Sequence, residues 1–179
     1  MASLLALLSS VLWGTADFVG GYLTKKHKAA IVTAASQVFG LALGIILVIS
    51  TNSFIRPNFA WNGYLIPGIF SSVAGFLGLV VFYQGLATGS MGVVSSIGSL
   101  GAIIPIAIAF INGERPHQHQ IYGMVIALIG AFCASGPEVL KGSQLKPILL
   151  GIAAMFLFGT ALSFMAIGSK VSSLLTMTT

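Results

Sequence analysis

Long apolar stretches alternate with short polar segments along this chain. Apart from Asp17, no charged residue falls in the stretches 2–24, 29–55, 57–113, 116–137 and 147–169. A helix needs about 20 mostly apolar residues to cross the hydrocarbon core of a bilayer, so every stretch is long enough to cross once. The stretch 57–113 is long enough to cross twice, and turn-forming residues at 87–90 lie near its middle.

This pattern predicts six helices joined by short connections. They cover about 2–23, 30–51, 63–86, 91–112, 119–136 and 147–169. Short connections make neighbouring helices antiparallel. No segment is polar enough and long enough to form a soluble domain. We therefore predict an all-α fold, a polytopic transmembrane helix bundle with about six spans.

Composition supports a membrane protein. Charged residues make up 6% of the chain and hydrophobic residues 56%, whereas a soluble domain contains about 25% charged residues. Most of the surface must therefore face lipid. The net charge of +5 does not indicate nucleic-acid binding, because the basic residues lie in the connections between apolar stretches, as membrane insertion favours.

The basic residues give a weak signal for orientation. Lys25, Lys26, Lys28, Lys141 and Lys146 lie on one side of the predicted bundle, and Arg56, Arg115 and Lys170 lie on the other. This small bias favours an external N-terminus under the positive-inside rule, and it leaves the orientation open.

An internal repeat relates the first and the sixth predicted helix. Residues 11–16 resemble residues 156–161, at a constant offset of 159 − 14 = 145 residues. Five helices fit within this offset, and five is odd, so the second copy enters the membrane from the opposite side. This arrangement predicts an inverted-topology repeat, which is common in secondary transporters. The alternative is a chance similarity between two apolar helices.

The repeat divides the chain into two parts. Residues 1–140 form a first five-helix repeat, and residues 141–179 begin a second repeat with the sixth helix. A complete second repeat would need four more helices. We therefore expect either a truncated product or a chain that pairs with a second chain, or with another copy of itself, to complete the bundle.

Polar groups inside a membrane protein are the best indicators of a functional site. Asp17 is the only ionisable residue well inside a predicted span, and Trp13 lies one turn before it on the same face. The antiparallel order brings other polar residues to a similar depth on the same side. Together with Trp13 and Asp17, the predicted solute-binding residues are Tyr83, Gln84, Ser95, Ser96 and, deeper in the membrane, Thr160.

Other interpretations of these residues remain open. Asp17 could reach interfacial water or pair with the lysines at 25–28, which would relieve the cost of burying its charge. Gln84 could be an interfacial residue. The serines at 95 and 96 could serve packing or bond to the backbone of their own helix.

Two further residues, Pro105 and Glu114, are expected to shape the fourth predicted helix. Pro105 should kink its helix and leave the backbone carbonyl near Gly101 without its helical partner. Such a kink could act as a gate or only shape the packing. Glu114 ends the same helix, and its carboxylate could bond to the start of a neighbouring helix.

The sequence argues against enzymatic chemistry and cofactors. One Asp, two Glu, three His and the single Cys133 provide no paired intramembrane acids and no H-E-x-x-H motif. His117 and His119 have no third ligand nearby in the sequence, so neither a metal nor another cofactor is expected. A nucleotide-binding P-loop is also absent from the sequence, which excludes ATP-driven transport by this chain alone.

The chain resembles the EamA-type family of the drug/metabolite transporter superfamily. The resemblance rests on an ordered set of motifs: 13–18, 83–87, Pro105, 113–116, Gln120 and Gly123. It implies ten helices in two inverted five-helix repeats, located in the bacterial cytoplasmic membrane. It also implies ATP-independent transport of small polar metabolites, held in a cavity between the halves. This chain departs from that plan after its sixth helix, so the alternative is a non-transporting membrane fragment or an assembly subunit.

Overall fold

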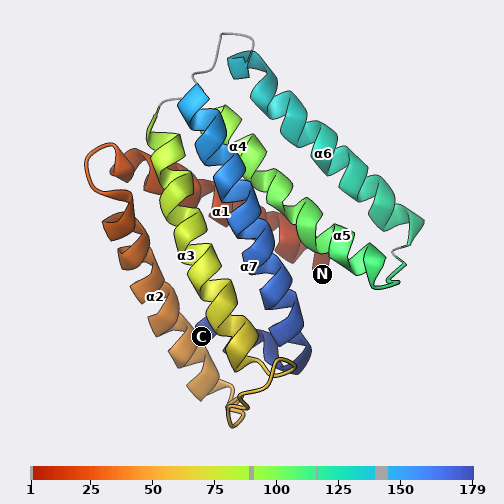
Figure 1. Ribbon diagram of the computed structural model, residues 1–179. Coiled ribbons are helices and arrows are strands. Elements are labelled where there is room, and N and C mark those ends of the chain that lie inside the picture. Colours follow the sequence, from red (N-terminus) through yellow and green to blue (C-terminus); the bar gives the residue numbers. More distant parts are fainter. Residues whose placement is uncertain (1, 89–90, 116, 140–144) are drawn as a thin grey trace.

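The computed structural model describes residues 2–88, 91–115, 117–139 and 145–179. In this part of the chain all six predicted helices form, and the fourth is divided into three pieces (Figure 1). The elements are α1 (Ala2–Thr24), α2 (Ala29–Ser50), α3 (Leu65–Ala87), α4 (Met91–Ser99), the 3₁₀-helix η1 (Leu100–Ala102), α5 (Ile103–Ile111), α6 (Gln118–Val139) and α7 (Leu145–Thr178).

Five helices in the described residues are long and apolar enough to cross a membrane. They are Leu4–Thr24, Ala29–Ser50, Leu65–Ala87, Met91–Ile111 and Leu145–Thr178. The predicted polytopic helix bundle is therefore confirmed. α6 forms where the remaining span is expected, and its crossing of the membrane stays a prediction.

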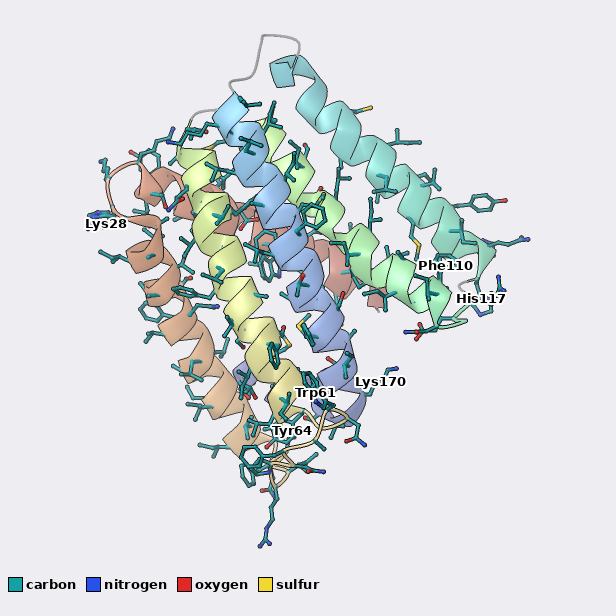
Figure 2. The ribbon with its side chains drawn as sticks, viewed as in Figure 1. Lys28, Trp61, Tyr64, Phe110, His117 and Lys170 are labelled. Atoms are coloured by element: carbon teal, nitrogen blue, oxygen red, sulfur yellow. The ribbon has the colours of Figure 1, made fainter. Side chains whose placement is uncertain are left out.

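Successive helices run in alternating directions, so the connections gather at two opposite ends of the bundle. Figure 2 places Lys28, before α2, far from Trp61 and Tyr64, which precede α3. The second connection is held together by a hydrogen bond of 2.8 Å from the Tyr64 hydroxyl to the Ile55 carbonyl. The two ends correspond to the two membrane surfaces expected from the sequence.

The centre of the bundle is the contact between α3 and α7, which lie side by side (Figure 1). The small residues Ser71, Gly75 and Gly78 form the side of α3 that faces α7. A Cβ on Gly78 would lie 2.8 Å from the Phe158 ring, so glycine makes room for this ring. The Ser71 hydroxyl donates a 2.8 Å hydrogen bond to the Ala161 carbonyl. Such bonds between membrane helices contribute about 0.6 kcal/mol each.

Near Pro105 the helix changes to the 3₁₀ turn η1, directly before α5, and a kink at this place stays a prediction. Proline has no N–H to donate to the Gly101 carbonyl, so the regular α-helical bond is missing there. At this turn α4 and α5 meet α7 through backbone atoms. A Cβ on Gly101 would lie 2.6 Å from the Met155 carbonyl oxygen, and one on Gly159 would lie 2.8 Å from the Gly101 carbonyl oxygen.

The last helix is longer than the predicted range 147–169, because α7 continues past a break at Ser172. Ser172 has extended backbone angles (φ −158°, ψ 113°), and its hydroxyl accepts a 3.3 Å hydrogen bond from the Leu175 N–H. This is the geometry of an N-cap, so Ser172 starts a new helical turn. The following turn folds back, with Thr176 against Gly168 and Thr178 against Gly44 of α2.

Candidate functional site

A pocket of about 240 Å³ lies where α1, the end of α3 and the start of α4 meet. Its lining residues are Gly14, Asp17, Phe18, Leu86, Met91, Gly92 and Ser95. Asp17 is the one charged residue among them. The pocket therefore combines a carboxylate and a serine hydroxyl with mainly apolar walls.

Two glycines of α1 set the position of Asp17. A Cβ on Gly21 would lie 2.7 Å from the Leu86 Cβ, and a Cβ on Gly20 would overlap the ring of Tyr83. α1 can approach α3 this closely only because both positions lack side chains. Asp17 lies three and four residues before these glycines, on the same face of the helix. The carboxylate is thereby directed into the crevice between α1 and α4.

The charge of Asp17 is not neutralised by the nearby lysines. In the described residues, no lysine lies within ion-pair distance of Asp17, and the Lys26 ammonium instead lies 5.7 Å from the centroid of the Tyr22 ring. Tyr83 is buried, and its ring packs against Gly20, one helical turn after Asp17. Pairing with the lysines at 25–28, one of the open interpretations, does not form in this structure.

The structure brings some of the predicted site residues together. Asp17 and Ser95 line the same pocket, and the Tyr83 ring packs against Gly20, one turn of α1 from Asp17. Ser96 is also buried, but it does not line the pocket, and its carbonyl accepts a 2.8 Å hydrogen bond from the Ser99 hydroxyl.

Three other predicted site residues lie elsewhere. Trp13 is 61% exposed on α1, and Gln84 is exposed on α3. Thr160 is exposed on α7, and its hydroxyl donates a 2.8 Å hydrogen bond to the Phe156 carbonyl of its own helix. These three side chains are outside the pocket lining in the structure as described.

Sequence reasoning missed the apolar walls, which Phe18, Leu86 and Met91 provide. No signal in the sequence selects Phe18 over Trp13, because both lie within about one turn of Asp17 on an apolar helix. The pocket face of α1 follows Gly14, Asp17 and Phe18, at spacings of three and four residues, rather than Trp13 and Asp17. The face that contains Gly14 and the face that contains Trp13 differ by a rotation of α1 by one residue. Only the contact of α1 with α3 shows which face lines the pocket.

Glu114 lies at the end of α5, as predicted, and its backbone takes part in ending the helix. The Glu114 N–H donates to the Ala109 carbonyl at 3.0 Å, and the Gly113 N–H donates to the Phe110 carbonyl at 3.0 Å. Gly113 has φ +85°, so these bonds form a Schellman motif. The start of α6 is capped by another residue, since the Gln120 side-chain oxygen accepts a 2.8 Å hydrogen bond from the His117 N–H.

Comparison with known proteins gives the family. Residues 1–136 match the EamA-like transporter family. The chain belongs to this family. The match covers most of the chain, from α1 into α6, and includes every residue of the Asp17 pocket. No match to the chain was found among curated proteins or among solved structures.

Membership in the EamA-like family makes this a multi-pass membrane protein of a transporter family, and members of this family are transporters rather than enzymes. The resemblance noted in the sequence is confirmed. The family match ends before α7, so it gives no information about the inverted second repeat.

Proposed function

We propose that this EamA-like chain takes part in the secondary transport of small polar metabolites and that the Asp17 pocket binds the solute. The observation that carries the proposal is an unpaired carboxylate in a small, mostly apolar pocket at a helix junction. A charge is costly to keep in such surroundings unless it has a role or a partner.

The lining residues suggest how a solute is held. The Asp17 carboxylate accepts hydrogen bonds from a hydroxyl, amide or ammonium group of the solute. The Ser95 hydroxyl both donates and accepts, so it can orient a second polar group. Phe18 and Met91 contact the apolar part of the solute. The pocket volume is about 240 Å³, which is enough for a small molecule.

The break beside Pro105 supports a gating role in the same proposal. Ser95 lies on α4, and η1 separates α4 from α5. A missing backbone hydrogen bond lets α4 change its angle to α5 without unwinding either helix. Such a change would widen or narrow the pocket between α4 and α1. Because the sequence has no P-loop, solute or ion gradients supply the energy.

We further propose that the protein works in the bacterial cytoplasmic membrane and that a second chain, or a second copy, completes the bundle. The internal match between 11–16 and 156–161 supports this view, because α7 then begins an inverted second repeat after residue 140. A non-transporting fragment or assembly subunit is the alternative, and a transport measurement separates the two.

The test is uptake of a panel of ¹⁴C-labelled amino acids and small amines into proteoliposomes containing the full chain. Asp17→Asn keeps the shape of the side chain and removes its charge, so we expect it to abolish uptake. Ser10→Ala is the matched control on α1, since the Ser10 hydroxyl only bonds to its own helix. Uptake by Asp17→Asn at the wild-type rate would refute the role of Asp17. If no member of the panel accumulates, either with this chain alone or with a co-expressed second chain that completes the bundle, the result would favour the alternative.

A further inference from the structure

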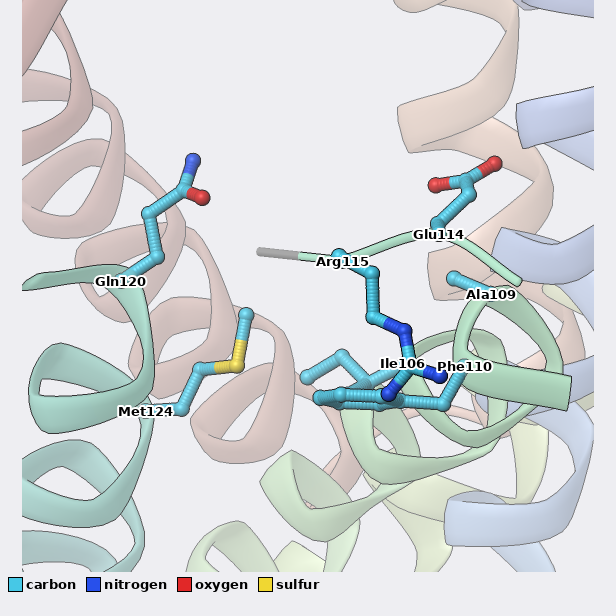
Figure 3. Close-up of a pocket in the computed structure, with 7 residues that line it drawn as sticks. All are labelled: Ile106, Ala109, Phe110, Glu114, Arg115, Gln120 and Met124. Carbon is cyan, nitrogen blue, oxygen red and sulfur yellow. The ribbon is translucent and has the colours of Figure 1, made fainter. Parts of the chain in front are cut away.

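A second pocket, of about 320 Å³, lies between the end of α5 and the start of α6. Its lining residues are Ile106, Ala109, Phe110, Glu114, Arg115, Gln120 and Met124 (Figure 3). It shares no residue with the Asp17 pocket. The two pockets lie at opposite ends of the Met91–Ile111 span, and therefore at opposite membrane surfaces.

The backbone on both sides of this pocket is well fixed. The Schellman motif at Gly113 holds the end of α5, and the bond from the His117 N–H to Gln120 holds the first turn of α6. These two motifs set the separation of the apolar walls, with Phe110 on one side and Met124 on the other (Figure 3).

Two opposite charges lie at the rim of this pocket without binding each other. Glu114 and Arg115 are both exposed, and in the part of the chain that the structure describes they form no ion pair. Figure 3 shows the Arg115 guanidinium turned toward Phe110 and the Glu114 carboxylate turned the other way. The rim therefore offers a cationic and an anionic binding group to an external ligand.

The depth of the pocket indicates where that ligand comes from. The Met91–Ile111 span ends at the pocket, so Glu114 and Arg115 lie at the level of the lipid headgroups. Ile106 and Phe110 extend from there into the hydrocarbon region along α5. The matching ligand has a positive and a negative group at one end and apolar chains at the other.

We propose that this pocket binds phosphatidylethanolamine. Arg115 binds the phosphate, because the guanidinium matches phosphate geometry. The Glu114 carboxylate accepts hydrogen bonds from the primary ammonium, and the acyl chains lie against Ile106 and Met124. A choline headgroup has no N–H to donate, so it binds less well. An anionic headgroup lacks the ammonium and is repelled by Glu114.

Native mass spectrometry of the full chain in detergent tests this assignment. Equal amounts of dioleoyl phosphatidylethanolamine, phosphatidylcholine and phosphatidylglycerol compete for the protein, and the bound fraction of each is measured. We expect wild type to prefer phosphatidylethanolamine. Arg115→Gln should reduce its bound fraction about two- to fivefold, the range that exposed charge pairs give. Glu114→Gln should reduce phosphatidylethanolamine binding and leave phosphatidylcholine binding unchanged.

Arg56→Gln is the matched control, because Arg56 is an exposed arginine in the connection before α3, on the same side of the bundle as Arg115. It should leave all three bound fractions as in wild type. Equal loss in Arg56→Gln and Arg115→Gln would overturn the proposal, as would a preference for phosphatidylglycerol. Unchanged binding in both Glu114→Gln and Arg115→Gln would also overturn it. Circular dichroism confirms that each variant is folded, and none of these readouts depends on solute transport.

Discussion

Single glycines place Asp17, the one acidic residue within the five candidate spans of the described residues. Gly20 and Gly21 allow α1 to lie directly on Tyr83 and Leu86, and Asp17 is carried into the pocket by this contact. The geometry of the Asp17 pocket thus depends on residues that contribute no side chain of their own.

We predict that Gly20→Ala destabilises the protein and Gly40→Ala does not. A Cβ at Gly20 would lie less than 3.0 Å from three carbons of the Tyr83 ring, whereas a Cβ at Gly40 would meet nothing within 4 Å. Overpacking costs about 1–3 kcal/mol, and alanine returns up to about 1 kcal/mol of helix propensity at either position. Thermal unfolding in detergent should show a lower Tm for Gly20→Ala and an equal or higher Tm for Gly40→Ala. Equal shifts in the two variants would contradict the close packing of α1.

The site could be predicted from the sequence only in part, for a reason visible at the residue scale. Asp17 and Ser95 were placed at one depth by counting along antiparallel helices, and they do line one pocket. Depth is fixed by position along a helix, but the direction of a side chain depends on rotation about the helix axis. α1 is apolar on most of its circumference, so its sequence does not distinguish the face of Trp13 from that of Gly14.

At the scale of the helix, the sequence predicts well which helices form and where each lies along the chain. Lipid offers no hydrogen-bond partners to the backbone, so an apolar stretch of sufficient length becomes a helix. The same argument does not reveal where a helix changes direction. Pro105 gives that signal in the fourth helix, but the break at Ser172 depends on one hydroxyl and one N–H. Hydropathy carries no information about such a cap.

We predict that Ser172→Ala loosens the final turn of α7. The substitution removes the hydroxyl that accepts from the Leu175 N–H, and the loss of an N-cap costs about 1 kcal/mol. Hydrogen exchange should become faster at residues 173–178 and stay unchanged in α3. Ser169→Ala is the control, because the Ser169 hydroxyl bonds to Met165 within a continuous helix. Faster exchange in both variants would show that the Ser172 cap is not responsible.

At the scale of the whole molecule, the order of the helices fixes which connections share a membrane surface. α2 crosses once between Lys28 and Arg56, so these residues lie on opposite surfaces. α3 and the Met91–Ile111 span cross twice between Arg56 and Arg115, so these two lie on one surface. The charge bias alone leaves open which surface is cytoplasmic.

Cysteine labelling tests this arrangement. In a Cys133→Ser background, single cysteines replace Lys28, Arg56 or Arg115 in sealed vesicles of one orientation. Before permeabilisation, a membrane-impermeant maleimide should label either Arg56→Cys and Arg115→Cys together or Lys28→Cys alone. The cysteines on the other surface should be labelled only after permeabilisation. Labelling of Lys28→Cys and Arg56→Cys from the same surface would contradict the predicted crossing by α2.

The backbone contact between Gly101 and Gly159 has a consequence for the path of a solute. Gly101 is at the middle of the Met91–Ile111 span, and the two backbones meet there too closely for side chains or water to intervene. This crossing is a seal at mid-membrane between the fourth span and α7. Under the proposed function, a solute leaving the Asp17 pocket would pass along α1 instead, where a Cβ at Gly14 would meet nothing within 4 Å. Gly14→Leu should then block passage while leaving the protein folded, and undiminished uptake by that variant would place the path elsewhere.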